Sequence, residues 1–155
     1  MRRPVLAARR FLSQRRSAIH GRGVYARALI PADTRIVEYR GERISNAEAD
    51  RRYPDDEFAA HHTFLFALDD DTMIDAAYGG NLARWINHSC DPNCEAVEED
   101  GRIFIESIRD IPPGEELAYD YNYILPERHT PRMKKRFPCH CGAAACRGTI
   151  LGKKR

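Results

Sequence analysis

The chain has 155 residues, about the size of a single domain. It is 43% hydrophobic and 31% charged, with enough apolar residues for a packed core and too many charges for a fibre or a membrane protein. The longest apolar stretches have only a few residues, far below the ~20 needed to cross a bilayer, and no apolar segment follows the N-terminal arginines to mark secretion. We therefore expect one soluble globular domain without a membrane partner.

Charge is distributed unevenly along the chain. Residues 1–27 contain eight arginines, residues 128–155 contain nine Lys and Arg residues, and neither segment contains an acidic residue. Residues 28–127 hold the other eight basic residues and all 23 acidic ones, a net charge of −15. Two interpretations follow: the basic ends fold back on the acidic body or extend into solvent, or an acidic surface steers a basic peptide into a cleft.

The first elements in chain order are short. Residues 1–16 lack a clear period, so we expect a basic tail that frays and adds little to the core. Residues 17–44 combine short apolar runs with Gly and Pro, which predicts short strands and turns. Ser45 and Glu48 form a capping-box pattern, which predicts a short helix over residues 46–53.

The middle of the chain predicts hairpins around one short helix. Residues 62–75 suit two strands joined by an acidic turn, and residues 96–108 suit a second hairpin. Asn81 can cap a helical turn over residues 82–87, and residues 117–121 suit a last short strand. Many short strands with one or two small helices predict a mostly β, irregular domain, with a boundary near residue 125.

The five cysteines all lie after residue 89, and an odd number without a secretion signal favours metal thiolates in a reducing compartment over disulfides. Three of them form a tight cluster, Cys139, Cys141 and Cys146. A closed zinc site needs four ligands, so Cys90 or Cys94 would supply the fourth and pin the C-terminal segment onto the middle of the chain. Histidine ligands, or reduced thiols on a tail, are the alternatives.

Three further patterns bring polar or aromatic residues close together. They are Gly21-Arg22-Gly23, the polar run 84–93, and residues 114–121, in which alternation places Tyr119 and Tyr121 on one face of a strand. Each alone has a simple structural explanation: a turn, a buried histidine, and an aromatic stripe in the core.

Together, and in this order, the four patterns resemble the SET-domain family of protein lysine methyltransferases, with trithorax-like motifs. The matching segments are 19–26, 37–42, 75–93, 114–121 and, similar to the family's post-SET zinc segment, 139–148. The resemblance covers roughly residues 17–150. It implies small β-sheets with a knot-like crossing of the Asn87–Cys90 segment. It also implies a basic tail over 1–16, a SET domain over 17–125, and a post-SET zinc segment with a basic C-terminus over 126–155.

The resemblance further implies an activity and its residues. The enzyme would transfer methyl from S-adenosylmethionine to a lysine of a basic protein, a histone or a histone-like protein. Tyr121 would orient the lysine nitrogen. We do not expect Tyr121 to act as a general base, because an unperturbed tyrosine has a pKa of ~10. Tyr119 and Tyr39 would wall the lysine channel, with Phe64, Phe66 and Tyr78 as further candidates.

The cofactor and the metal have their own predicted residues. The resemblance implies contacts to S-adenosylmethionine from His20, Arg22, Tyr25, Phe64, Arg84, Asn87, His88 and His140. It implies one structural zinc on Cys90, Cys139, Cys141 and Cys146, with Cys94 free. The sequence departs from the family pattern at Trp85, where Phe is more common, and at Phe64, where a cofactor-contacting Tyr is common.

Two other functions are weighed against the enzyme. One is a catalytically silent SET-like module that binds basic peptides. The other is a small zinc-dependent nucleic-acid binder that uses the basic ends, although the acidic centre limits direct nucleic-acid contacts to weak ones. We expect an intracellular protein, cytoplasmic in a bacterium, and nuclear in a eukaryote or when delivered to a host cell.

Overall fold

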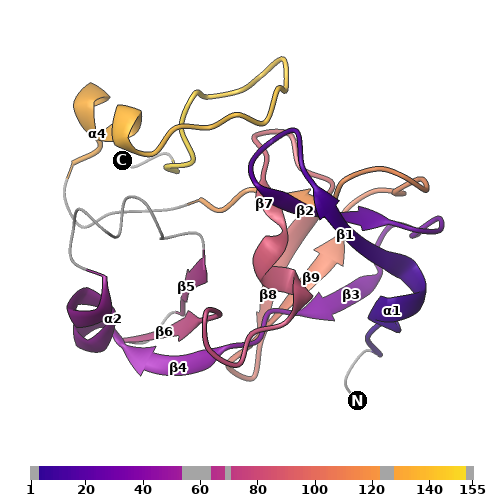
Figure 1. Ribbon diagram of the computed structural model, residues 1–155, viewed down its shortest axis with the longest axis horizontal. Helices are drawn as coiled ribbons and strands as arrows, with labels where there is room; N and C mark the ends of the chain where they lie inside the picture. Colours follow the sequence, from indigo (N-terminus) through magenta and orange to yellow (C-terminus); the bar gives the residue numbers. More distant parts are fainter. Residues whose placement is uncertain (1–3, 54–63, 69–70, 123–127, 153–155) are drawn as a thin grey trace.

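The computed structural model describes residues 4–53, 64–68, 71–122 and 128–152, and within them the strands form three small sheets. The first pairs β1 (Leu12–Arg16) with β2 (Arg22–Ala26). The second has the order β3 (Arg35–Glu38), β9 (Arg102–Ser107), β8 (Cys94–Glu99), β10 (Ala118–Tyr119) and β7 (Asn87–His88), and the third has the order β4 (Glu42–Ser45), β6 (Thr72–Asp75) and β5 (Leu65–Ala67). Figure 1 shows the three-stranded sheet at the lower left and the C-terminal segment along the top. The predicted mostly β class is confirmed.

The described residues also form four short helices: α1 (Ala8–Phe11), α2 (Asn46–Arg52), η2 (Leu82–Trp85) and α4 (Pro131–Arg136). The predicted cap of α2 is confirmed, because the Ser45 hydroxyl accepts a hydrogen bond from the Glu48 backbone. The predicted turn after Asn81 is confirmed as η2, a single 3-10 turn. Helix α4 was not predicted, although Thr130 caps it and Pro131 stands at its first position.

Residues 4–16, the described part of the N-terminal segment, belong to the fold, so the expectation of a fraying tail is wrong for them. Strand β1 pairs with β2 from Leu12 opposite Ala26 to Arg16 opposite Arg22. The Leu12 side chain is buried in the main core, and Phe11 packs against it. Backbone pairing and two apolar side chains order this segment, while its described arginines, Arg9, Arg10, Arg15 and Arg16, are exposed.

The hairpins agree with the prediction where the structure describes them. Strands β8 and β9 pair antiparallel from Cys94 opposite Ser107 to Glu99 opposite Arg102, and β5 pairs antiparallel with β6. Residues 62, 63, 69 and 70 of the other predicted hairpin lie outside the described residues, as does residue 125 of the predicted boundary. The last strand is shorter than predicted: β10 contains only Ala118 and Tyr119.

Strand β10 brings two distant motifs together. It pairs in parallel with β7, with Ala118 opposite Asn87 and Tyr119 opposite His88, and its other neighbour is β8. The Asn-His motif and the tyrosine motif therefore lie side by side in one sheet, as the resemblance implied. The main core is largely aliphatic, with Tyr39 and Tyr119 also buried in it. Its aliphatic members include Val24, Ile30, Ile36, Ile86, Ile105, Ile111 and Leu117.

Candidate active site and metal site

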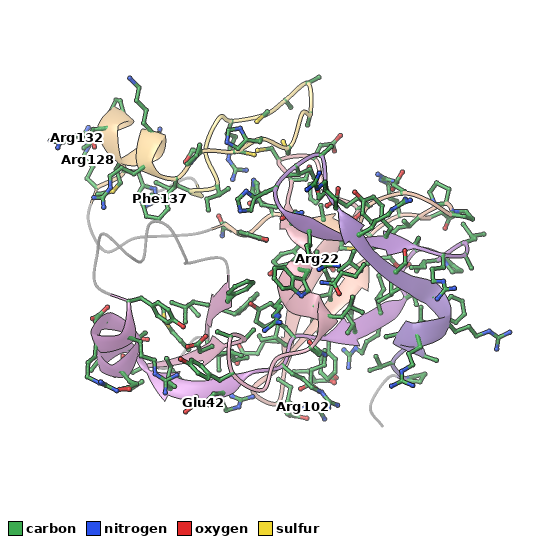
Figure 2. All side chains as sticks on the ribbon, in the orientation of Figure 1. Arg22, Glu42, Arg102, Arg128, Arg132 and Phe137 are labelled. Atoms are coloured by element: carbon green, nitrogen blue, oxygen red, sulfur yellow. The ribbon has the colours of Figure 1, made fainter. Side chains whose placement is uncertain are left out.

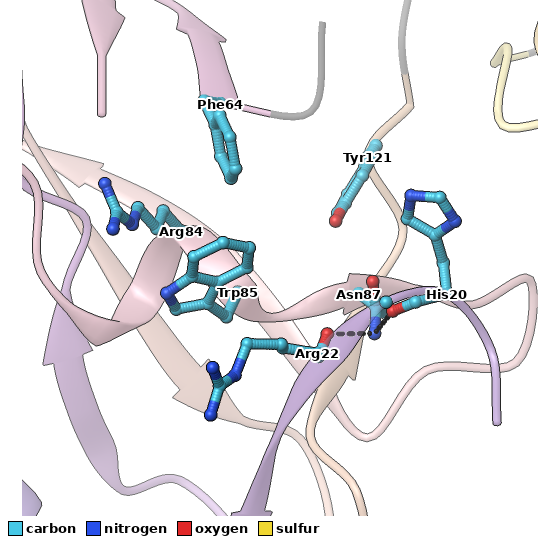
Figure 3. Close-up of a pocket in the computed structure, with 8 residues that line it drawn as sticks. His20, Arg22, Phe64, Arg84, Trp85, Asn87 and Tyr121 are labelled. Carbon is cyan, nitrogen blue, oxygen red and sulfur yellow. Dashed lines mark hydrogen bonds between the residues drawn. The ribbon is translucent and has the colours of Figure 1, made fainter. Parts of the chain in front are cut away.

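A pocket lies where the loop before β2, η2, β7 and the segment after β10 meet (Figure 3). Its lining residues are His20, Gly21, Arg22, Phe64, Arg84, Trp85, Asn87 and Tyr121. Five of the eight residues predicted to contact the cofactor are among them, together with the predicted catalytic tyrosine. The structure thus brings together residues that are up to a hundred positions apart in the chain.

Asn87 fastens one wall of this pocket. Its side-chain Nδ2 lies 3.1 Å from the His20 carbonyl oxygen and 3.0 Å from that of Arg22, and Figure 3 shows both contacts. The same nitrogen lies 2.9 Å from Oε2 of Glu116. Because Asn87 is buried, these bonds form out of water and hold the 20–22 loop against β7.

Glu116, which the sequence analysis did not single out, lies behind this wall. Its carboxylate accepts hydrogen bonds from the Ser17 hydroxyl at 2.8 Å, from Asn87, and from the Tyr25 hydroxyl at 3.2 Å. A Cβ atom on Gly23 would lie 2.3 Å from its Oε2, so any other residue at this position would have to displace the carboxylate. Tyr25, which was predicted to contact the cofactor, does not line the pocket, and its hydroxyl is bonded to Glu116.

The opposite wall combines aromatic rings with a cation. The Phe64 and Trp85 rings meet edge to face with their centroids 5.2 Å apart. The Arg84 guanidinium lies 4.9 Å from the Trp85 ring centroid and 5.6 Å from that of Phe64. Such a wall offers flat apolar area beside positive charge, which suits a ligand with an aromatic base and a carboxylate.

The Tyr121 hydroxyl points into the pocket (Figure 3). It donates a hydrogen bond to the backbone oxygen of Ile86 at 2.5 Å. Burial raises the pKa of Tyr121, and the negative charge of Glu116 raises it further. The phenol is therefore neutral, its proton is engaged by Ile86, and its oxygen can accept a hydrogen bond from a ligand.

A row of aromatic rings extends from Tyr121 towards β3 and β5. Tyr119 lies 4.9 Å from Tyr121 between ring centroids, Phe66 lies 6.4 Å from Tyr119, and Tyr39 lies 5.3 Å from Phe66. Burial raises the pKa of both Tyr39 and Tyr119, which keeps their hydroxyls neutral. Tyr78, a further candidate for this wall, is 56% exposed and has its ring beneath Arg52.

His88 supports Tyr121 and does not line the pocket. Its Nδ1 accepts a hydrogen bond from the Tyr121 backbone N–H at 3.0 Å, and its Nε2 lies 3.4 Å from the Cys90 sulfur. Burial lowers the pKa of His88 to about 4, against the opposing effect of Asp120, so the imidazole is neutral with its proton on Nε2. His140, also predicted to contact the cofactor, is exposed and lies outside the pocket lining.

The sulfur atoms of Cys90, Cys139, Cys141 and Cys146 lie within 4.8 Å of one another. The Cys90 and Cys139 sulfurs are 3.8 Å apart, about the separation of two thiolates on one tetrahedral zinc with Zn–S bonds of ~2.3 Å. Cys94 lies apart from them, buried on β8. The donor set therefore fits zinc and is the set that the resemblance implied.

Backbone N–H groups surround this cysteine cluster. Those of Arg147, Cys141 and Gly148 donate to the sulfurs of Cys90, Cys139 and Cys146, respectively. Burial opposes ionisation of Cys141, but N–H donors from Cys90 and Ala143 lower its pKa to about 6. Donors of this kind stabilise the thiolate form that a metal requires.

Comparison with known proteins identifies the family, because residues 21–122 match the family described as the SET domain. The chain belongs to the SET domain family. It is 45% identical over 142 residues to a Chaetomium globosum protein and 44% identical over 142 residues to a Saccharomyces cerevisiae protein, each named "Histone-lysine N-methyltransferase, H3 lysine-4 specific". It is 41% identical over 140 residues to "Histone-lysine N-methyltransferase SETD1" of Drosophila melanogaster. The predicted family is confirmed.

These alignments cover 87% of this SET domain chain in each case. They cover 13% of the two fungal relatives and 8% of the Drosophila relative, so the chain spans about a tenth of their length. None of the helices in the described parts of the chain is long and apolar enough to cross a membrane.

Proposed function

We propose that this SET domain transfers a methyl group from S-adenosylmethionine to the side chain of a lysine in a basic protein. The observation that carries the proposal is the neutral Tyr121 hydroxyl, which points into a pocket of predicted cofactor-contacting residues in a SET domain. The names of the relatives favour lysine-4 of histone H3 as the substrate. A histone substrate would in turn place the protein in the nucleus of a eukaryote. The acidic composition of residues 28–127 suits a basic substrate peptide.

The pocket chemistry suits the cofactor. S-adenosylmethionine supplies an electrophilic methyl group on a sulfonium and also carries a carboxylate and an adenine base. Arg22 and Arg84 offer cations for the carboxylate, while Phe64 and Trp85 offer flat apolar area for the base. Asn87 contributes indirectly, because its side chain holds the backbone of the 20–22 loop in place.

The lysine side is assigned to the aromatic row. The nucleophile is the lone pair of a neutral amine. The buried rings of Tyr39 and Tyr119 and the partly buried ring of Phe66 remove water around it and so favour the neutral form. Tyr121 accepts a hydrogen bond from the amine and aims its lone pair, since its own proton is donated to Ile86. Solvent takes the proton from lysine, because the raised pKa makes Tyr121 a poor base.

The metal's role in this proposal is structural. Four cysteines complete a closed tetrahedral set, which leaves no open position for substrate. The metal would join Cys90, next to the pocket, to the C-terminal segment. Tyr121 packs against the small apolar cluster of that segment, formed by Phe137, Ile150 and Leu151. Folding of the segment and placement of Tyr121 are therefore linked.

The test is Tyr121→Phe, which keeps the ring and removes the hydroxyl. We expect methyl transfer to a histone H3 peptide to fall at least ~100-fold. Binding of S-adenosylmethionine, followed by the fluorescence of Trp85, the single tryptophan, should change less than ~3-fold, because the cofactor contacts assigned above remain.

The matched control is Tyr53→Phe. It removes a hydroxyl that also donates a hydrogen bond within the protein, to Asp75, but outside the pocket lining. Its turnover should stay within ~3-fold of the wild type. Near-normal turnover in Tyr121→Phe would remove Tyr121 from the mechanism. A wild-type protein that binds cofactor and peptide without transferring methyl would instead identify the silent binding module.

A further inference from the structure

Arg147 connects the cysteine cluster to the segment that carries Tyr121. It directly follows Cys146, and its guanidinium forms a bidentate ion pair with Asp120, with Nη1 2.7 Å from Oδ2 and Nη2 3.1 Å from Oδ1. The Arg147 side chain is 23% exposed and that of Asp120 33% exposed, so solvent screens the pair only in part. This contact also shows one basic end of the chain folded back on the acidic body.

Asp120 holds the backbone on both sides of Tyr121. It precedes Tyr121 in the chain, and its Oδ1 accepts a hydrogen bond from the Asn122 backbone N–H at 2.9 Å. Asn122 has a φ of 46°, a left-handed conformation that needs such local support. The carboxylate therefore bridges the turn whose central residue is Tyr121, and a rotation of Asp120 would move the phenol.

Arg147 is itself held from two directions. Its backbone N–H donates to the Cys90 sulfur at 3.3 Å, and its Nη2 also lies 3.2 Å from the Leu151 backbone oxygen. Its Nε is buried without a hydrogen-bond partner among the described residues, a cost that offsets part of the gain from the ion pair. Removing Arg147 should therefore change the position of Asp120 more than the stability of the domain.

We propose that Arg147 is a positioning residue for methyl transfer, which transmits the placement of the C-terminal cysteine segment through Asp120 to the Tyr121 hydroxyl. His88 makes a second connection of the same kind, from the Cys90 sulfur to the Tyr121 backbone. Arg147 reaches the Tyr119–Asn122 segment through the Asp120 carboxylate, and His88 reaches it through the Tyr121 backbone N–H. The two connections adjoin, because His88 Nδ1 lies 3.6 Å from Oδ1 of Asp120. This inference rests on the proposed function, because Tyr121 matters only if it orients the reacting amine.

The first experiment measures the position of Tyr121 without using activity. The full chain is labelled with 3-fluorotyrosine, and Tyr121→Phe assigns the fluorine resonance of Tyr121. We expect Arg147→Ala to shift or broaden this resonance and to leave that of the exposed Tyr78 unchanged. Zinc content should stay the same, because Arg147 supplies no thiolate. An unmoved Tyr121 resonance, or loss of zinc from Arg147→Ala, would overturn the inference.

The second experiment measures kinetics. Arg147→Ala should lower kcat for a histone H3 peptide ~10- to 100-fold, the scale of a displaced catalytic group, and change the KM for S-adenosylmethionine less than ~3-fold. Arg147→Lys should recover only part of kcat, because an ammonium cannot form the bidentate pair. In a double-mutant cycle with Asp120→Asn, the kcat of the double variant should be no lower than that of the less active single variant. Additive losses would show that Arg147 acts through another group.

Arg102→Ala is the matched control. Arg102 forms a bidentate pair with Glu38 at 2.9 and 2.7 Å, at a similar level of burial, and lies on the side of the molecule away from the C-terminal segment (Figure 2). Arg102→Ala should leave kcat and the Tyr121 resonance unchanged. If Arg102→Ala and Arg147→Ala lowered kcat equally, the effect of Arg147→Ala would be general destabilisation, and the inference would be wrong. A wild-type chain without turnover would refute the proposed function alone, since the fluorine resonance still tests the connection to Tyr121.

Discussion

The close approach of β2 to Glu116 makes Gly23→Ala a sharp test of the pocket wall. The added methyl carbon would lie 2.3 Å from Oε2 of Glu116, and a closest approach below 3.0 Å forces one of the two groups to move. Gly23 is in a strand and has no positive φ, so alanine itself fits the backbone there. The carboxylate must therefore give way, which weakens its hydrogen bonds to Ser17, Asn87 and Tyr25.

The magnitude follows from these bonds. A hydrogen bond to a charged group contributes about 1.5–3 kcal/mol, and displacement of the carboxylate by a fraction of an ångström weakens two or three of them without breaking all. We expect Gly23→Ala to lower the free energy of unfolding by about 2–4 kcal/mol, measured by urea denaturation. Cofactor affinity should fall with it, because Asn87 holds the 20–22 loop through the same group.

The double-mutant cycle decides whether Glu116 is the cause. In a Glu116→Ala background the added methyl group meets no carboxylate, and its remaining close neighbour is the Ser17 Cβ at 3.0 Å. Gly23→Ala should therefore cost only about 1 kcal/mol there, well below its cost in the wild-type background. Gly23→Ala without effect in the wild-type background, or equally costly in both backgrounds, would refute this account of why the strand has glycine at this position.

Three other predictions follow from the site and the ion pairs. Cys90→Ser should lower zinc retention as much as Cys141→Ser does, measured by metal analysis after gel filtration, whereas Cys94→Ser should retain one zinc per chain. Zinc loss in Cys94→Ser but not in Cys90→Ser would refute the ligand set. Tyr119→Phe should shift the products of a mass-spectrometric time course towards trimethyl-lysine, because the buried Tyr119 hydroxyl occupies space beside Tyr121; an unchanged distribution would count against it. The hydrogen bond from Arg102 lowers the pKa of Glu38 from its ordinary value of 4.5, so this pair contributes stability above that pH and loses it as the pH falls through the lowered pKa. The free energy of unfolding should therefore fall less steeply with decreasing pH in Glu38→Gln than in the wild type, and an identical pH dependence would contradict the assignment.

The sequence predicted elements well where local chemistry determines them. The cap at Ser45, the turn after Asn81 and the β8–β9 hairpin depend on residues close in the chain, and each is confirmed. The prediction for residues 1–16 was wrong because arginine-rich composition suggested solvent exposure, whereas pairing with β2 and burial of Leu12 order the segment. Helix α4 was missed although a Thr-Pro start was present in the sequence.

The site was predictable mainly through its motifs. They indicated most of the pocket lining and four cysteines whose sulfurs cluster, but could not distinguish a residue that faces the pocket from one that supports it. Tyr25 and His88 do not line the pocket; Tyr25 is bonded to Glu116, and His88 to the backbone of Tyr121. Glu116 itself was missed because its partners come from three separate segments, and no local spacing reports such a contact.

The dependence of Tyr121 on the C-terminal apolar cluster has a consequence for a chain during its synthesis. The pocket lining ends at Tyr121, but Phe137, Ile150 and Leu151, on which Tyr121 packs, are translated later, as are three of the four clustered cysteines. A nascent chain can pair its strands as they leave the ribosome, since β1 to β10 precede this point. Tyr121 acquires the C-terminal part of its support only after residues 137–151 have emerged. A premature stop before Cys139 would thus yield paired strands in which Tyr121, the proposed catalytic residue, lacks its contacts with Ile150 and Leu151, and in which Cys90 lacks its three partner cysteines.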